Sequence, residues 1–209
     1  MPLKTIDPVT TAPRAANSEA PSPDILDWHG NEDLLAPPVA DALRSLPAED
    51  ILGVTRNSDE ESDTDLWCPR NGVPFGITGN VVIVHTHKTR KAPPQFAAAL
   101  VTGDTRADLN GAVRHTLEMS KVSFAPAAEA TQATGMESGG MSPIGLPAGW
   151  PLLVDPRILA LPRLYIGSGI RPSKLVVRGA IFTALAATGR DVRLVEGLGV
   201  PRTNLPQVV

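Results

Sequence analysis

The chain has 209 residues, of which 42% are hydrophobic and only 4% aromatic, and its formal net charge is −3. This length suits one domain with tails, and the acidic balance argues against a general nucleic-acid-binding protein, which usually carries a basic surplus. No stretch approaches the run of about 18 to 20 apolar residues that a membrane span needs, and the N-terminus lacks the apolar segment of a secretory signal. The single cysteine, Cys68, excludes an internal disulfide and favours a reducing compartment, so we expect the cytoplasm.

The two halves of the chain differ in charge. Residues 1–103 contain 8 Lys/Arg and 14 Asp/Glu, whereas residues 104–209 contain 11 Lys/Arg and 8 Asp/Glu. A local basic patch attracts a polyanion even on an acidic protein. A normally solvated surface explains the same numbers, so charge alone does not identify a partner.

The composition suggests one folded domain between two tails. Residues 1–27 are rich in Pro, Ala, Ser and Thr with little to bury, which predicts a disordered tail. The folded domain is expected over residues 28–200, followed by a short tail over 201–209. Strand and helix patterns are interspersed without a regular βαβ alternation. We therefore expect a mixed α/β fold whose sheet is largely antiparallel and flanked by helices.

In the first half, residues 37–47 (PPVADALRSLP) show helical spacing with prolines at both ends. Residues 55–76 are acidic and then rich in turn formers, so we expect a surface loop with at most one short helix. The β-branched run at 80–87 (NVVIVHTH) predicts a buried strand, and 96–103 (FAAALVTG) predicts its neighbour.

The second half alternates between helix and strand patterns. A helix is predicted over 104–121 with Asp104 or Thr105 as its N-cap, and Gly135 is predicted to close a short helix over 127–135. A buried strand then ends at Asp155, where an Asp-Pro pair predicts a helical turn. The other expected elements are strands at 121–126, 151–155, 163–169, 174–179 and 193–199 and a helix at 179–189.

The stretch GGMSPIGLP at 139–147 contains three glycines and two prolines. Closely spaced backbone N–H groups in such a turn form a nest that binds an anion or a developing oxyanion, and Ser142 could add a hydroxyl. A tight connection ordered by glycine and proline explains the same composition. The residues alone leave both interpretations open.

Four motifs occur in a characteristic order: Thr134-Gly135, the loop from Gly139 to Gly145, Val154-Asp155, and Gly167-Ser168-Gly169 with Arg171 and Lys174 soon after. Through these motifs, residues 73 to 186 resemble the YbaK / prolyl-tRNA-synthetase-associated domain family. That family comprises editing domains, which hydrolyse mischarged aminoacyl-tRNA. The resemblance implies an aminoacyl-tRNA deacylase that acts on the 3′ acceptor end of tRNA without a metal or cofactor. It also allows an aminoacyl-tRNA synthetase as a partner.

The resemblance also implies a site, in which loop amides face the ester carbonyl and the terminal ribose helps to activate a water. The implied catalytic residues are Gly139, Gly140, Ser142 and Pro143. The implied substrate-binding residues are Asn80, Asp155, Gly167, Ser168, Gly169, Arg171 and Lys174, the last two near the tRNA end.

One departure from the family pattern bears on activity. Active relatives carry a lysine at the start of the first core strand, and this position falls on Gly79 here. Asn80, His85 and Lys121 are the candidates to replace it. The alternative is a catalytically weak or inactive relative that binds tRNA or an aminoacyl ligand without hydrolysis.

Two other clusters support weaker hypotheses. His85 and His87 lie two apart and would share one face of a strand, as metal ligands do. A metal needs further ligands, and the remaining histidines are His29 and His115, so a polar strand end is the simpler interpretation. Cys68 lies in no nucleophile motif, and ordinary packing explains it.

Overall fold

The computed structural model describes residues 22–89 and 91–208, so most of the tail expected over 1–27 lies outside the described residues. Near its start, Leu26 already pairs with Val54 in an isolated bridge. No helix in the described part of the chain is long and apolar enough to cross a membrane. The helices are α1 (Pro37–Leu43), α2 (Thr64–Arg70), α3 (Arg114–Thr116), α4 (Ala127–Thr134) and α5 (Ile181–Ala187). Shorter turns are 3-10 helices at Glu32–Leu34, Ala48–Asp50, Asp59–Ser62, Phe75–Ile77 and Pro156–Ala160 and a π-helix at Leu109–Val113.

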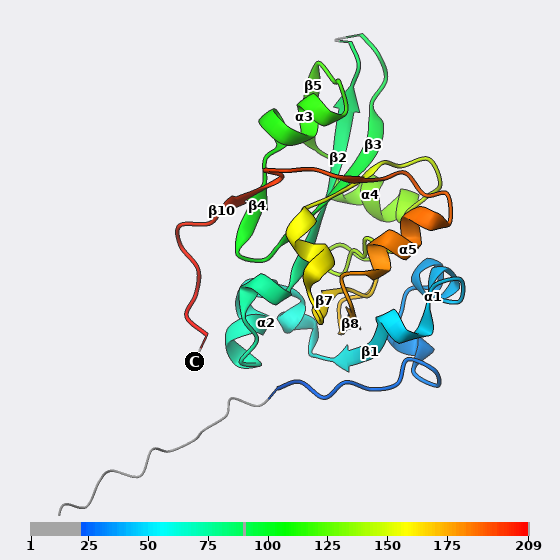
Figure 1. Cartoon of the computed structure of the whole chain (residues 1–209), viewed down its shortest axis with the longest axis vertical. Helices are drawn as coiled ribbons and strands as arrows, with labels where there is room; N and C mark the ends of the chain where they lie inside the picture. Colours follow the sequence, from blue (N-terminus) through cyan, green and yellow to red (C-terminus); the bar gives the residue numbers. More distant parts are fainter. Residues whose placement is uncertain (1–21, 90, 209) are drawn as a thin grey trace, which may run out of the picture.

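The strands form three sheets among the described residues (Figure 1). The strands are β1 (Ile51–Arg56), β2 (Gly79–His87), β3 (Gln95–Thr102), β4 (Thr105–Ala107), β5 (Lys121–Phe124), β6 (Leu152–Val154), β7 (Leu164–Gly167), β8 (Ser173–Val177), β9 (Val192–Leu194) and β10 (Gly199–Pro201). A five-stranded sheet has the order β5-β2-β3-β6-β9, in which β6 and β9 run parallel to β3. An antiparallel sheet β1-β8-β7 and a ribbon β10-β4 complete the fold. The expected mixed α/β, largely antiparallel fold is confirmed, although it is divided among sheets.

The edge of β2 is only partly covered. β3 pairs with β2 from Gly79 to Thr86, whereas β5 pairs with its other side only from Val84 to His87. The first half of β2 therefore has an open edge, and β7 approaches there, because Thr78 just before β2 bridges to β7. This open edge positions the candidate site.

Two aliphatic clusters hold the sheets together. The larger one packs one face of the five-stranded sheet against the β1-β8-β7 sheet, α1 and α5, and Leu100, Ile166 and Phe182 are almost fully buried there. The smaller one covers the opposite face with the segment that contains the π-helix and α3. The low aromatic content of the sequence is consistent with these aliphatic cores.

The helix predicted over 104–121 is wrong in its extent, because only residues 109–116 are helical. Its first residues instead form β4, because Thr105 and its neighbours pair with β10 at the far end of the chain. The N-cap is Asp108, not Asp104 or Thr105, and its carboxylate accepts hydrogen bonds from the N–H groups of Gly111 (2.9 Å) and Ala112 (3.1 Å). These two bonds lower the pKa of Asp108.

The prediction for 55–76 is wrong in part: the one short helix that it allowed is present, but the segment is not a surface loop. The segment contains the end of β1 and all of α2, and the side chains of Trp67 and Cys68 are buried. β1 was missed because its pairing partner, β8, lies more than a hundred residues away along the chain. At the other end, β10 spans the expected domain boundary at residue 200.

Candidate functional site

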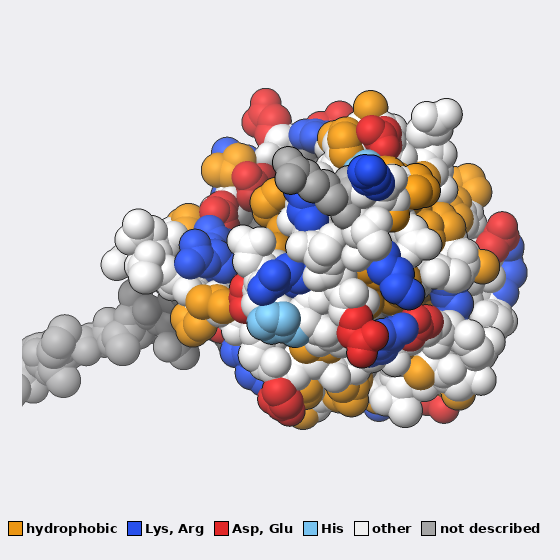
Figure 2. Space-filling view, turned by 90° about the horizontal axis from the view of Figure 1, so that it is seen from above, with side chains coloured by type: hydrophobic (Ala, Val, Ile, Leu, Met, Phe, Trp, Pro, Cys, Tyr) orange, Lys and Arg blue, Asp and Glu red, His pale blue; other side chains and the backbone are white. Residues whose placement is uncertain are grey.

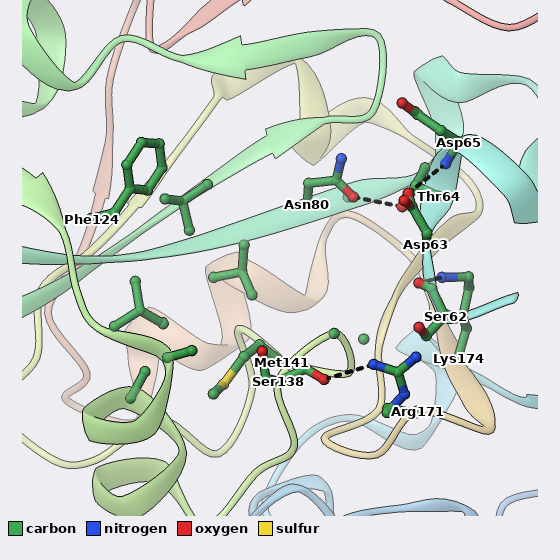
Figure 3. A pocket seen from close by; sticks show the side chains of 18 of the residues that line it. Ser62, Asp63, Thr64, Asp65, Asn80, Phe124, Ser138, Met141, Arg171 and Lys174 are labelled. Atoms are coloured by element: carbon green, nitrogen blue, oxygen red, sulfur yellow. Dashed lines mark hydrogen bonds between the residues drawn. The ribbon is translucent and has the colours of Figure 1, made fainter. Parts of the chain in front are cut away.

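A cavity of about 750 Å³ opens at the uncovered edge of β2 (Figure 3). Its walls come from the turn before α2, from β2, from the connection between β5 and α4, from the glycine-rich loop, and from β7 and β8. The lining residues are Glu60, Ser62, Asp63, Thr64, Asp65, Gly79, Asn80, Val81, Val82, Ile83, Phe124, Ala125, Ala127, Ala130, Ser138, Gly139, Met141, Gly167, Arg171, Lys174 and Arg202.

The two glycine-rich segments meet on one side of this cavity. The N–H of Gly169 donates to the carbonyl oxygen of Gly140 at 2.7 Å, and a Cβ on Gly167 would lie 1.9 Å from the carbonyl oxygen of Met141. Gly139 has a φ of 90°, which favours glycine. The close approach of the two segments' backbones therefore explains why both are rich in glycine. The backbone N–H groups of Gly139 and Met141, both lining residues, donate to no acceptor among the described residues.

Lys174 brings a buried positive charge into the cavity from β8. Its exposed fraction is 7%, its Nζ donates to the carbonyl oxygen of Ser62 at 3.3 Å, and it lies 5.1 Å from the ring centroid of Trp67. It forms no ion pair with a described carboxylate. Burial lowers the pKa of Lys174 to about 8. The amine is thus cationic at neutral pH and close to its titration point.

Arg171 adds a second positive charge at the rim. Its guanidinium donates to the carbonyl oxygens of Asp59 (3.0 Å) and Ser138 (3.4 Å), so it links the turn before α2 to the glycine-rich loop. The opposing charges are carboxylates of that same turn and helix. Of these, Asp65 is paired with Arg202 through two short contacts of 2.8 and 2.6 Å, while Glu60 and Asp63 are exposed.

The opposite end of the cavity is apolar. Figure 3 shows Phe124 on one side of the cavity and Lys174, Ser62 and Arg171 on the other. The apolar lining consists of Val81, Val82, Ile83, Phe124, Ala125, Ala127, Ala130 and Met141. Such a cavity accommodates a ligand with one apolar end and one end that carries an ester or an anion.

The structure brings together only some of the predicted site residues. Asn80, Gly139, Gly167, Arg171 and Lys174 line the cavity, whereas Gly140, Ser142, Pro143, Asp155, Ser168 and Gly169 do not. Ser142 is fully buried and its hydroxyl accepts from the N–H of Ile144 at 3.1 Å. The Ser168 hydroxyl lies 2.6 Å from that of Ser173. These two hydroxyls order loops rather than face the cavity.

Asp155 caps the turn that follows β6. Its side chain accepts from the N–H of Arg157 at 3.1 Å and pairs with the Arg157 guanidinium at 2.7 Å. With an exposed fraction of 4%, Asp155 is enclosed by these contacts. The simpler of its two interpretations, an N-cap, therefore describes its geometry.

Gly79 has no room for the lysine that the resemblance places there. A Cβ at this position would lie 2.9 Å from Cγ2 of Ile166. Of the proposed replacements, His85 and Lys121 do not line the cavity. Asn80 does, but its side-chain oxygen already accepts from the Thr64 hydroxyl at 2.8 Å. The buried cation of the cavity is Lys174 instead, which the sequence had suggested only for the tRNA end.

The cavity wall formed by Glu60, Ser62, Asp63 and Asp65 was missed because the whole segment was expected to be a surface loop. A usable signal exists in SDTDLW, where Asp63 is the N-cap of α2 and accepts from the N–H of Asp65 at 2.9 Å. An acidic N-cap ahead of a buried tryptophan would have predicted a packed helix here.

The remaining candidates do not line the cavity. Cys68 is fully buried, and burial raises the pKa of its thiol to about 11, so the thiol is protonated at neutral pH. His87 Nδ1 lies 3.2 Å from the carbonyl oxygen of Ala92, and His85 is buried against Phe96. Within residues 22–89 and 91–208, no cluster of three His, Cys, Asp or Glu side chains could hold a metal ion.

Both the sequence and the fold of this chain are similar to those of known proteins. The model of the aminoacyl-tRNA editing domain family matches residues 68–184, which is more than half of the chain, and the chain belongs to this family. No curated protein sequence matches it.

Two solved structures show the same fold. One is described as a candidate trans-editing enzyme for prolyl tRNA synthetase, with 21% identity and a TM-score of 0.59 over 77% of this chain and 95% of that one. The other is the hypothetical protein APE2540, with 23% identity and a TM-score of 0.56 over 68% of this chain and 89% of that one.

Proposed function

We propose that the protein is an aminoacyl-tRNA deacylase, a trans-editing hydrolase that removes a wrong amino acid from its tRNA. Membership of the editing-domain family supports this proposal. The observation that carries it is Lys174, a buried cation without a carboxylate partner among the described residues, in a cavity that is also lined by Gly139 and Met141, whose N–H groups donate to no described acceptor. A cavity that only bound its ligand would have less need of an unpaired buried charge, which is costly.

The chemistry follows from these groups. Water attacks the ester carbonyl carbon, negative charge develops on the carbonyl oxygen, and the bond to the ribose oxygen then breaks with transfer of a proton to that oxygen. The ammonium of Lys174 and the N–H groups of Gly139 and Met141 are suited to stabilise this charge. Donors held in place before the reaction stabilise the transition state more than the ground state. The adjacent ribose hydroxyl assists the water.

The polar rim suits the rest of the substrate. The exposed carboxylates of Glu60 and Asp63 complement the α-ammonium group of an aminoacyl ester, and the apolar end accepts the adenosine or a small side chain. A trans-editing activity would operate beside an aminoacyl-tRNA synthetase, with prolyl-tRNA synthetase as the first partner to test because of the description of the solved relative. Translation takes place in the cytoplasm, the compartment that we expect.

The test is deacylation of a panel of mischarged tRNAs by the wild type, Lys174→Met and Lys174→Arg. We expect wild-type turnover on at least one substrate and a loss of roughly 10²- to 10³-fold in kcat for Lys174→Met, as for loss of one oxyanion donor. Lys174→Arg keeps the charge and should retain part of the activity. The wild-type rate should fall above about pH 8, where Lys174 loses its proton, once spontaneous ester hydrolysis is subtracted.

Lys121→Met is the matched control, because Lys121 is an exposed lysine outside the cavity, and its replacement should leave kcat unchanged. Turnover that survives Lys174→Met unchanged would mean that another group stabilises the oxyanion. If the wild type hydrolyses none of the panel yet binds uncharged tRNA, the protein is the non-hydrolytic relative of the alternative interpretation.

A further inference from the structure

Phe124 is not explained by the chemistry of the cavity. It ends β5, and its exposed fraction of 70% is the largest of any large hydrophobic side chain in the described part of the chain. Leaving such a side chain in water forgoes about 2 kcal/mol of burial energy. A lone exposed apolar residue is ordinary on a protein surface. The surroundings of Phe124 therefore decide whether it has a role.

Phe124 lies between two hollows. It lines the large cavity and also a hollow of about 300 Å³ beside β4, and the two share Asn80, Val82 and Arg202. A third hollow of about 270 Å³ shares Arg106 and Arg202 with the second. The three hollows adjoin one another through these shared residues, and we call the two smaller ones, which extend from Phe124 along the β4-β10 ribbon, the acceptor groove.

The charge differs between the large cavity and the acceptor groove. The large cavity is lined by three carboxylates, those of Glu60, Asp63 and Asp65, and by three cations, those of Arg171, Lys174 and Arg202, of which Arg202 is paired with Asp65. The two smaller hollows contain Arg106 and Arg202 and no Asp or Glu among their described lining residues. Arg106 is exposed and forms no ion pair with a described carboxylate. A polyanion that leaves the cavity through the acceptor groove therefore meets the unpaired cation of Arg106 and no carboxylate among the described lining residues of the two smaller hollows.

We propose that the acceptor groove binds the single-stranded 3′ end of tRNA, with a base stacked on Phe124 and a backbone phosphate paired with Arg106. An exposed aromatic ring beside an unpaired cation is typical of single-strand binding, and stacking tolerates any base because every base has a π-face. This proposal rests on the proposed function, which places the ester in the cavity. It directs the polynucleotide away from Arg171, beside which the sequence suggested the tRNA end.

Binding is measured separately from hydrolysis. A fluorescent tRNA minihelix with an uncharged, single-stranded 3′ end is titrated with the protein at several salt concentrations. Phe124→Ala should weaken binding about tenfold, and Phe124→Trp should preserve it, because stacking on an aromatic ring accounts for that share of affinity. Arg106→Gln should weaken binding and reduce the slope of log K against log salt by about 0.7, the value for one phosphate contact on a single strand.

Matched controls lie elsewhere on the surface. Leu194 is also exposed (54%) but belongs to β9, at the opposite edge of the five-stranded sheet, and Arg178 is an exposed arginine outside all three hollows. Leu194→Ala and Arg178→Gln should bind like the wild type. Circular dichroism is used to check that each variant folds. Because these side chains are exposed, we expect their replacement to leave the fold intact.

The outcomes separate the two proposals. If the minihelix binds as expected but no charged tRNA is hydrolysed, the groove stands and the proposed function fails. If mischarged tRNA is hydrolysed while Phe124→Ala and Arg106→Gln bind and turn over like the wild type, the groove is overturned and the function stands. Equal losses in the Leu194→Ala and Arg178→Gln controls, or a wild type that does not bind the minihelix, also overturn the groove.

Discussion

Replacing Lys174 by methionine should make the protein more stable while it removes activity. Burial lowers the pKa of Lys174 from 10.5 to about 8, and each pKa unit corresponds to about 1.4 kcal/mol, so holding the ammonium in the fold costs about 3 kcal/mol at neutral pH. Methionine has a similar length, carries no charge and can keep the contact with Trp67. With allowance for relaxation and for the lost bond to Ser62, we expect Lys174→Met to raise the free energy of unfolding by about 2 kcal/mol at pH 7.

The stability difference between the wild type and Lys174→Met should depend on pH in a defined direction. Between about pH 8 and 10.5 the unfolded chain holds a proton on Lys174 that the folded chain has released, so wild-type stability gains relative to the variant as pH rises. The advantage of Lys174→Met should therefore be full below about pH 8 and be lost as the pH rises from about 8 towards 10.5. Other titrating groups, Cys68 included, are common to both proteins and largely cancel in the difference.

Urea denaturation of the wild type, Lys174→Met and Lys174→Arg at a series of pH values measures this difference. Lys121→Met, an exposed substitution, should stay within about 0.5 kcal/mol of the wild type at every pH. The reasoning fails if Lys174→Met is less stable than the wild type at pH 7, or if the difference between them is the same at pH 7 and pH 10. Either result would mean that the ammonium is solvated or paired in solution.

Two further predictions concern residues that the structure places outside the cavity. Asp155→Ala removes the N-cap and leaves Arg157 without its partner. We therefore expect urea denaturation to show a free energy of unfolding lower by about 1 to 2 kcal/mol, with unchanged kcat/KM for deacylation. A loss of activity without a loss of stability would instead place Asp155 in the substrate site. Cys68 is buried, and the pKa of its thiol is raised to about 11. Folding therefore reduces both the access of a reagent to the thiol and the fraction of thiolate. Iodoacetamide at pH 8, followed by mass spectrometry, should alkylate Cys68 at least about a hundredfold more slowly in the native protein than in urea. Equal rates would place Cys68 at the surface.

The sequence predicted the elements whose signals are local. The β2-β3 hairpin is a pair of neighbouring apolar runs, and the helix that ends at Gly135 has its stop signal one residue beyond its last turn. Elements that depend on distant partners were missed or misassigned. β1 is a strand because it pairs with β8, and Thr105 is in a strand because it pairs with β10, although its own neighbourhood reads as a helix. Tertiary pairing overrode the local pattern in both cases.

The positive charge of the site was also difficult to place from the sequence. A motif assigns a role to a place along the chain, and the family resemblance expects a lysine at the position where this chain has Gly79. The proposed catalysis requires a positive charge at one place in the cavity, and side chains from several strands can reach that place. Lys174 is paired in register with Gly167 across β7 and β8, and both line the cavity into which the start of β2 opens. Ile166, next to Gly167, fills the space beside Gly79. The strand that crowds position 79 is thus hydrogen-bonded to the strand that carries Lys174, so one packing arrangement both fills the space beside Gly79 and places the Lys174 charge in the cavity. On this argument, a lysine restored at position 79 without a smaller residue at 166 would cost stability and add a second cation to a cavity that already holds one.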